Sequence, residues 1–309
     1  MFSFLMATTR LLHTSHGTNR EAFTLGDWAL FISLALIWGS SFLFMAIGLD
    51  AFHPGVVTLL RVVLGASILA LIPKARATKI DGEDRRHIVV LAAIWVAIPF
   101  TLFPIAQQWI DSAIAGMLNG ATPIFTALLA TVLLRSLPGP LQIAGLVIGF
   151  AGILAIALPS AGGDATAAIG VILVILATVG YAVSLNMVPP LQQKYGSLPL
   201  MARILRMATI MVLPFGIVGM ADSSFAWPSF LAVSAVGVLG TGLAFVLMGN
   251  LTGSVGATRA SFLTYLIPVV ALVLGVAFRD EVISPLAVVG VGLVIAGAIL
   301  ASRRETRRT

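Results

Sequence analysis

The chain contains one stretch twice, and this repetition constrains its fold more than any other feature does. Residues 115–158 align without a gap on residues 260–303, at a shift of 145 positions. Matches between prolines and glycines carry the most weight, because each of these residues fixes a feature of the backbone. The matches are Pro123 with Pro268, Pro140-Leu141 with Pro285-Leu286, Gly145 with Gly290, Ala151-Gly152 with Ala296-Gly297, and Leu60-Arg61 with Leu205-Arg206. The chain therefore consists of two related halves.

The composition is that of a membrane protein. Of the 309 residues, 59% are hydrophobic and only 10% are charged, and the mean hydropathy is +1.06. A soluble domain carries about 25% charged residues, so the long uncharged runs indicate a polytopic protein that lies in a lipid bilayer. Cysteine is absent, which excludes disulfides and thiol catalysis. The net charge of +6 does not indicate a nucleic-acid partner, because the basic residues lie in loops and tails.

Ten apolar spans divide the chain, each close to the ~20 residues that cross a bilayer. They cover residues 28–48, 55–72, 88–106, 112–134, 140–158, 168–188, 198–220, 229–250, 256–278 and 285–302. Because an open sheet edge is not tolerated in lipid, the expected fold class is an all-α membrane protein. Pro189-Pro190 is expected to end the sixth span. Gly145 and Gly149 predict close packing of the fifth span on the tenth, or on another subunit.

The lysines and arginines predict the orientation. With the N-terminus in the cytoplasm, 13 of the 18 lie in inner segments and only Arg279 in an outer one. This bias places both termini in the cytoplasm and the chain in the cell (inner) membrane. Five spans per half is an odd number, so the second half enters the membrane inverted, as in secondary transporters. The expected parts are a cytoplasmic tail at 1–26, five-helix repeats at 27–158 and 166–302, and a basic cytoplasmic tail at 303–309.

Several short motifs recur in an order that is typical of one family. They read Leu36-Ile37-Trp38-Gly39-Ser40-Ser41-Phe42, Leu60-Arg61-Val62-Val63, Ala121-Thr122-Pro123-Ile124-Phe125, Pro140-Leu141-Gln142-Ile143-Ala144-Gly145, Gly240-Thr241-Gly242-Leu243-Ala244, and Glu281 before Pro285-Leu286. In this order and spacing, residues 27–302 resemble the EamA-type family of the drug/metabolite transporter superfamily. The resemblance implies a ten-helix carrier, often an exporter of amino acids or other small metabolites. The chain departs from the family at Arg135-Ser136, where an acidic residue is common, and keeps that acid only as Glu281.

Arg61 and Arg206 occupy equivalent positions in the two halves, within apolar spans. A central arginine costs about 2.5–3.5 kcal/mol on insertion scales, so each needs a partner or a wet cavity. In one interpretation both face a central cavity and bind a substrate carboxylate. In the other, each is structural and bonds helix carbonyls or extends to the membrane surface.

Pro123 and Pro268 lie near the middle of the fourth and ninth spans and are expected to free the carbonyls of Asn119 and Thr264. Interrupted helices at matching positions of two halves indicate a binding site, although a packing kink gives the same pattern. We expect Asn119, Thr264, Arg61 and Arg206 to border one cavity. The aromatic residues within spans are candidates for stacking on substrate or for ordinary packing: Trp38, Trp95, Tyr181 and Tyr265.

No aspartate, glutamate or histidine lies deep in a span, so we expect no catalytic residue, metal site or cofactor. No phosphate-binding glycine loop is present, so ATP is not expected to drive the protein. The leading hypothesis is a secondary transporter. It would move a small metabolite, an amino acid or a related carboxylate, outward across the cytoplasmic membrane by alternating access. The alternatives are a membrane-embedded enzyme acting on a lipid or polyprenyl substrate, and a scaffold subunit. Monomer and homodimer both remain open.

Overall fold

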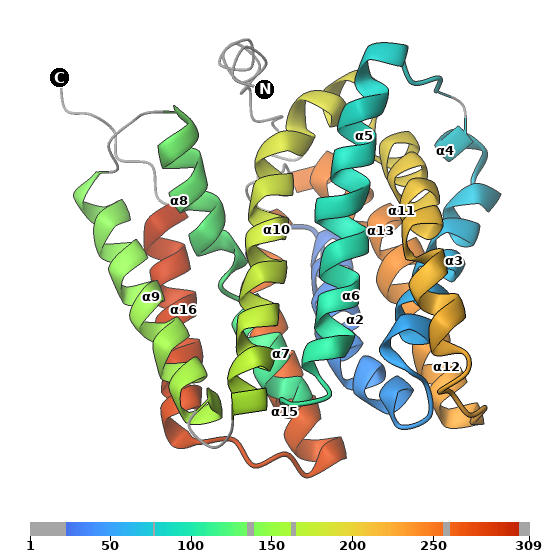
Figure 1. Cartoon of the computed structure of the whole chain (residues 1–309). Coiled ribbons are helices and arrows are strands. Elements are labelled where there is room, and N and C mark those ends of the chain that lie inside the picture. The colour runs from blue at the N-terminus through green and yellow to red at the C-terminus, as the bar shows by residue number, and fades with distance from the viewer. Residues whose placement is uncertain (1–22, 77, 135–138, 162–164, 256–259, 303–309) are drawn as a thin grey trace, which may run out of the picture.

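The computed structural model describes residues 23–76, 78–134, 139–161, 165–255 and 260–302 (Figure 1). Within these residues the chain is helical and contains no strand. The tails expected at 1–26 and 303–309 lie almost wholly outside the described residues, as does Arg135.

The first half has five helical segments. They are α2 (Leu25–Leu49), α3 (Pro54–Leu71) with the short α4 (Pro73–Arg76), the run η2 (Gly82–Asp84), α5 (Arg85–Leu91), η3 (Ala92–Ala97) and α6 (Ile98–Ala106), the pair α7 (Ser112–Asn119) and α8 (Thr122–Leu134), and α9 (Pro140–Ala161). Local sequence fixes where they begin. Thr24 and Asp27 form a capping box at the start of α2, with the Thr24 amide donating to Asp27 Oδ2 over 2.9 Å. Pro54 is the first residue of α3, a position where the missing N–H carries no penalty.

The second half follows the same plan. Its segments are α10 (Ala165–Tyr195), α11 (Ser197–Gly219), the run α12 (Trp227–Ala235), η4 (Val236–Leu243) and α13 (Ala244–Val255), then η5 (Ser261–Tyr265) with α15 (Ile267–Arg279), and α16 (Pro285–Ser302). The prediction that Pro189-Pro190 ends the sixth span is wrong, because α10 continues to Tyr195. Contacts at its last turn hold it: Lys194 Nζ and the Tyr195 hydroxyl both donate to Asp84, over 2.7 Å and 2.6 Å.

Within the part of the chain that the structure describes, eight helical spans are long and apolar enough to cross a membrane. Two shorter apolar helices, Leu263–Arg279 and Pro285–Leu300, coincide with the last two spans expected from the sequence. The chain is thus a multi-pass membrane protein, and much of its outer surface is apolar, with residues such as Leu158 and Ile210 more than 60% exposed. Such a surface suits lipid and not water.

The main contacts between helices recur when the two halves are exchanged. Three contacts join equivalent spans: α9 with α16, α3 with α11, and α7 with α15. Two further contacts each have a counterpart in the other half: α3 with η4 corresponds to α11 with η3, and α10 with α6 corresponds to α2 with α13. In Figure 1, α9 and α16 lie side by side and run in opposite directions. A Cβ on Gly152 would lie 2.7 Å from the Gly290 carbonyl oxygen, and one on Gly297 would overlap the Gly149 backbone. Close packing of the fifth span on the tenth is confirmed.

The two ends of the bundle, where helices begin and end (Figure 1), differ in the charged residues that they carry. The end where α5 begins and α10 ends, called the basic end, carries Lys74, Arg76, Lys79, Arg85, Arg86 and Lys194. The opposite end, called the acidic end, carries Asp50, Asp111, Asp222, Asp280 and Glu281, with Arg279 bound to Asp50 over 2.7 Å.

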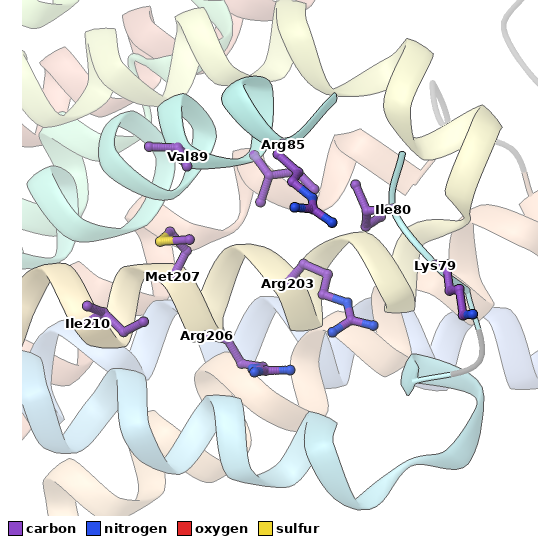
Figure 2. Close-up of a pocket in the computed structure, with 9 residues that line it drawn as sticks. Lys79, Ile80, Arg85, Val89, Arg203, Arg206, Met207 and Ile210 are labelled. Carbon is purple, nitrogen blue, oxygen red and sulfur yellow. The ribbon is translucent and has the colours of Figure 1, made fainter. Parts of the chain in front are cut away.

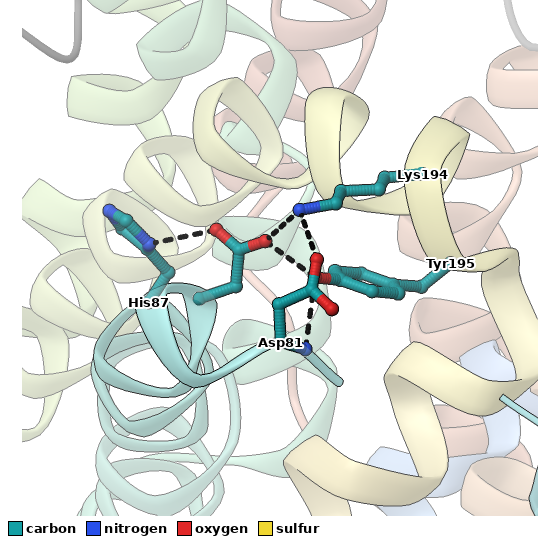
Figure 3. A network of polar contacts seen from close by, with 5 residues as sticks. Asp81, His87, Lys194 and Tyr195 are labelled. Carbon is teal, nitrogen blue, oxygen red and sulfur yellow. Dashed lines mark hydrogen bonds and ion pairs between the residues drawn. The ribbon is translucent and has the colours of Figure 1, made fainter. Parts of the chain in front are cut away.

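A polar network joins the halves at the basic end (Figure 3). Lys194 lies 2.7 Å from carboxylate oxygens of both Asp81 and Asp84, and the Tyr195 hydroxyl accepts from the Asp81 amide over 3.2 Å. Hydrogen bonds from Lys194 and Tyr195 hold the pKa of the Asp81 carboxyl below its usual value. Single ion pairs between exposed side chains contribute little to stability. We therefore interpret the network as a contact that fixes how the two halves meet at this end.

Candidate functional site

The third and eighth spans each contain a π-helical segment at equivalent positions. Ala92–Ala97 and Val236–Leu243 overlap when one is shifted by 145 residues. π-helical turns are rare and concentrate at functional sites, because the wider turn displaces backbone carbonyls from their usual partners. In η4, the Gly240 carbonyl accepts from the Trp38 indole N–H over 3.0 Å. The Val236 carbonyl accepts from the Thr241 hydroxyl over 3.2 Å.

Arg61 is buried beside this segment, with 7% of its surface exposed. Its Nε donates to Thr241 Oγ1 over 3.2 Å, and its guanidinium carbon lies 3.6 Å from the centre of the Phe100 ring. A terminal nitrogen contacts Met45 Sδ at 3.4 Å. Among the described residues, no carboxylate lies within 4 Å of this guanidinium. A cation–π contact is favourable when desolvated, but hydroxyl, ring and sulfur leave a buried charge without its counter-ion.

The aromatic residues that the sequence singled out within spans pack largely on other rings. Trp38 and Trp95 each meet Phe245 edge-on, with ring centres 6.5 Å and 6.2 Å apart. Tyr181 stacks on Phe103 at 5.9 Å and is close enough to Arg61 to interact electrostatically. Trp38, Trp95 and Tyr181 thus come from three different helical spans and pack on other rings. Trp38 binds the carbonyl of Gly240, the neighbour of the Thr241 that holds Arg61.

The fourth and ninth spans break at equivalent positions. α7 ends at Asn119 and α8 begins at Thr122, while η5 ends at Tyr265 and α15 begins at Ile267. Pro123 and Pro268 are the second residues of the helices that follow, where proline is tolerated. The breaks touch, because a Cβ on Gly120 would overlap the Pro268 ring.

The Asn119 carbonyl is not free, which corrects the expectation that Pro123 exposes it. The Thr122 hydroxyl donates to it over 2.8 Å, as serine and threonine commonly do beside a broken turn. The Asn119 side-chain oxygen Oδ1, by contrast, is buried and has no hydrogen-bond partner among the described residues. Thr264 has a partner of its own. An orphan amide oxygen at a helix break indicates a place for water or a ligand.

Arg206 does not join this site, which corrects the expectation that it borders one cavity with Arg61. Its side chain is exposed and lines a pocket with Lys79 and Arg85, and the residues of that pocket include none of the contacts of Arg61. The reason is helical phase: Ile204, Leu205 and Ala208 form the buried face of α11, and Arg206 points away from it. α3 is rotated differently about its own axis than α11, so that Arg61 is buried there while the preceding Leu60 is partly exposed.

The structure adds polar residues that sequence reasoning did not select. Thr241 holds Arg61, and Gln107 donates to the Phe42 carbonyl over 3.1 Å while its own oxygen Oε1 is buried without a partner. A search for polar side chains within apolar spans would have found Thr241, whereas Gln107 directly follows the third span. No signal in residue type would have found Phe100.

Comparisons with known proteins agree with this architecture. The chain is 28% identical to a "Probable terminal-alkyne amino-acid exporter" of Streptantibioticus cattleyicolor, over 91% of this chain and 94% of that protein. It is 25% identical to the "Uncharacterized transporter YdfC" of Bacillus subtilis, over 85% and 86% of the two chains. It is 26% identical to the "Uncharacterized inner membrane transporter YedA" of Escherichia coli K12, over 88% and 89%.

A solved crystal structure shares the fold, with a TM-score of 0.58 and 17% sequence identity over 89% of this chain and 96% of that one. The model of the EamA-like transporter family matches twice, once on each half, over residues 25–158 and 168–303. The two matches follow the internal repeat and together cover most of the chain. The protein therefore belongs to the EamA-like transporter family.

Proposed function

We propose that the protein is a secondary transporter that exports a small carboxylate-bearing metabolite, of the amino-acid class, by alternating access. Ten membrane helices form two inverted five-helix halves, with both termini in the cytoplasm. The basic end then faces the cytoplasm and the acidic end faces outward. The observation that carries the substrate class is the guanidinium of Arg61, buried at 7% exposure on neutral groups only.

The inverted arrangement is supported by the packing of the helices. Each half contributes one partner to α9 with α16, α3 with α11, and α7 with α15, and α9 runs opposite to α16 (Figure 1). Matching helix breaks and π-helical segments occur in both halves. Transporters with inverted repeats place the substrate where the halves meet, at discontinuous helices. Asn119 and Pro268 lie at such a place, and we propose them, with Pro123, Thr264 and Tyr265, as part of the substrate path.

The chemistry of the surroundings supports a carboxylate with an apolar body. A buried arginine binds a carboxylate with two parallel hydrogen bonds, and the anion removes the cost of an uncompensated charge. Trp38, Trp95 and Tyr181 supply apolar area beside it. The name of the relative from Streptantibioticus cattleyicolor describes an amino-acid exporter. An amino acid would supply the carboxylate partner that Arg61 does not have among the described residues.

Transport by purified protein in liposomes tests the proposal. Vesicles are loaded with a mixture of unlabelled L-amino acids, and exchange is measured against each labelled amino acid outside. We expect exchange of at least one amino acid and no exchange of its carboxamide analogue, because the amide offers no negative charge to Arg61. Equal exchange of acid and amide would contradict the role of Arg61. Absence of exchange for every amino acid tested would contradict the substrate class.

A further inference from the structure

A groove of about 410 Å³ runs between the two halves near the basic end, apart from the site around Arg61 (Figure 2). One wall is α5 of the first half, the other is α11 of the second, and the segment before η2 closes one end. The lining residues are Lys79, Ile80, Arg85, Ile88, Val89, Arg203, Arg206, Met207 and Ile210.

Four of these nine residues are cationic and none is acidic. The side chains of Lys79, Arg85, Arg203 and Arg206 make no hydrogen bond or ion pair with any described residue. Lys194, at the same end, contrasts with them, because it is bound to both Asp81 and Asp84. Four like charges gathered without an acid repel one another, and an anion bound among them would remove that repulsion.

The groove is also polar at one end and apolar at the other. Figure 2 shows Lys79 at one end and Val89, Met207 and Ile210 at the opposite end, with the arginines between. Arg206 lies nine residues into α11, which is about 14 Å along the helix axis at 1.5 Å per residue. Ile210 is 64% exposed and Val89 is 39% exposed, so the apolar end opens toward the lipid. An arginine that merely extends to the surface would not need an apolar channel beside it.

We propose that this groove binds an anionic phospholipid of the leaflet at the basic end. The phosphate contacts Arg203, Arg206 and the cations opposite them, and an acyl chain follows Met207 and Ile210. Basic pockets between membrane helices at the cytoplasmic face suit anionic headgroups. The lipid would touch one helix from each half, so its binding favours the arrangement in which α5 and α11 are this close. The inference does not depend on Arg61 or on the substrate.

Native mass spectrometry and thermal unfolding of the detergent-purified protein test the proposal. Phosphatidylglycerol is the anionic probe, phosphatidylcholine the neutral one, and glycerol 3-phosphate the soluble anion. We expect retained phosphatidylglycerol and a raised unfolding temperature with that lipid alone. Protection by glycerol 3-phosphate equal to that by phosphatidylglycerol would overturn the proposal in favour of a soluble-anion site. Equal retention of both lipids would overturn it in favour of unspecific lipid contact.

Variants locate the site. The double variant R203Q/R206Q is expected to retain phosphatidylglycerol at least about tenfold less, since even one charge-assisted hydrogen bond contributes about 1.5–3 kcal/mol and 1.4 kcal/mol is tenfold. The double variant R203K/R206K keeps both charges and is expected to retain most of the lipid, which controls for misfolding. R86Q is the matched control, because Arg86 is exposed on α5 next to Arg85 and does not line the groove. Equal lipid loss in R86Q and R203Q/R206Q would overturn the assignment. R61Q should retain the lipid, which separates this inference from the proposed substrate site.

Discussion

Glu281, in the second half, caps the N-terminus of α7 in the first half through Ser112. Its Oε1 accepts from the Ser112 amide over 2.9 Å and from the Ser112 hydroxyl over 2.6 Å, and its Oε2 accepts from the Ala113 amide over 2.8 Å. These amides have no partner within their own helix, and the helix dipole favours a negative charge there. A carboxylate from the connection between α15 and α16 thereby joins the halves at the acidic end.

We predict that Glu281→Ala destabilises the protein, because two buried amides and a hydroxyl lose their acceptor, at about 1–3 kcal/mol for each unsatisfied group. Glu281→Gln keeps an acceptor oxygen for Ser112 and should destabilise less. Thermal unfolding in detergent measures both. Asp222→Ala, at an exposed acid of the same end, is the control and should unfold like the unmodified protein. An unfolding temperature for Glu281→Ala equal to that of the control would contradict the capping role.

Asp111 lies immediately before this cap, and burial, followed by the charge of Glu281, raises the pKa of its carboxyl. A raised pKa means that the ionised form is disfavoured in the folded protein. Protonation of Asp111 therefore favours the folded state. This contribution to the free energy of unfolding is complete below the usual pKa of 3.8 and is lost as the pH rises through the raised pKa of the folded protein. At neutral pH, Asp111 therefore lowers stability.

Asp111→Asn should raise the unfolding temperature at pH 7, because the Asp111 side chain makes no cap hydrogen bond that could be lost and asparagine carries no charge. The gain should shrink as the pH falls toward about 4, where the aspartate itself becomes protonated. Unfolding measured between pH 4 and pH 8 tests this, with Asp222→Asn as the control. A gain that is independent of pH would point to packing and not to the charge.

The sequence predicted the features of the fold that depend on residue type. Pro123 and Pro268 mark the helix breaks because proline lacks an N–H and can only begin a new helix there. Gly152 and Gly290 mark the close pair of helices, because any side chain would hold the backbones apart. Both kinds of residue act on their own backbone, but a proline does not always end a helix, since Pro189 and Pro190 lie inside α10.

Features that depend on helix rotation could not be predicted in this way. Arg61 and Arg206 align in sequence, but Arg61 faces the interior and Arg206 is exposed in the pocket near the basic end. The reason is that α3 and α11 present different faces to their neighbours. An internal alignment fixes position along the helix and leaves this rotation open. The π-helical segments were not predicted either, since neither contains a residue that enforces the wider turn.

The orientation in the membrane leads to a labelling prediction. The chain has no cysteine, so single cysteines at Arg76 and Asp222 report on the two ends without background. Both side chains are exposed and lie at the basic and acidic ends. A thiol reagent that does not cross the membrane, added to intact cells, should label Asp222→Cys and should label Arg76→Cys only after lysis. The opposite pattern would place the basic end outside.

Arg61 holds the buried positive charge that the proposed substrate would meet. Arg61→Gln should lower exchange of the transported amino acid by about 10- to 100-fold, since the charge-assisted bonds lost are worth about 1.5–3 kcal/mol. Arg61→Lys should lose less, because lysine keeps the charge but not the planar fork that binds a carboxylate. The comparison variant is Arg86→Gln, which removes an equal charge from an exposed position at the basic end and should exchange normally.

A structural role for Arg61 would give a different result, because its contacts with Thr241 and Phe100 also hold α3 against η4 and α6. Loss of those contacts would lower the unfolding temperature of Arg61→Gln. The folded molecules of the variant would still respond to the substrate much as the unmodified protein does. A substrate role predicts the reverse. The transported amino acid should raise the unfolding temperature of the unmodified protein, by mass action on the folded state, and should fail to raise that of Arg61→Gln. A variant that unfolds at the normal temperature and is still protected by the amino acid would exclude Arg61 from the substrate site.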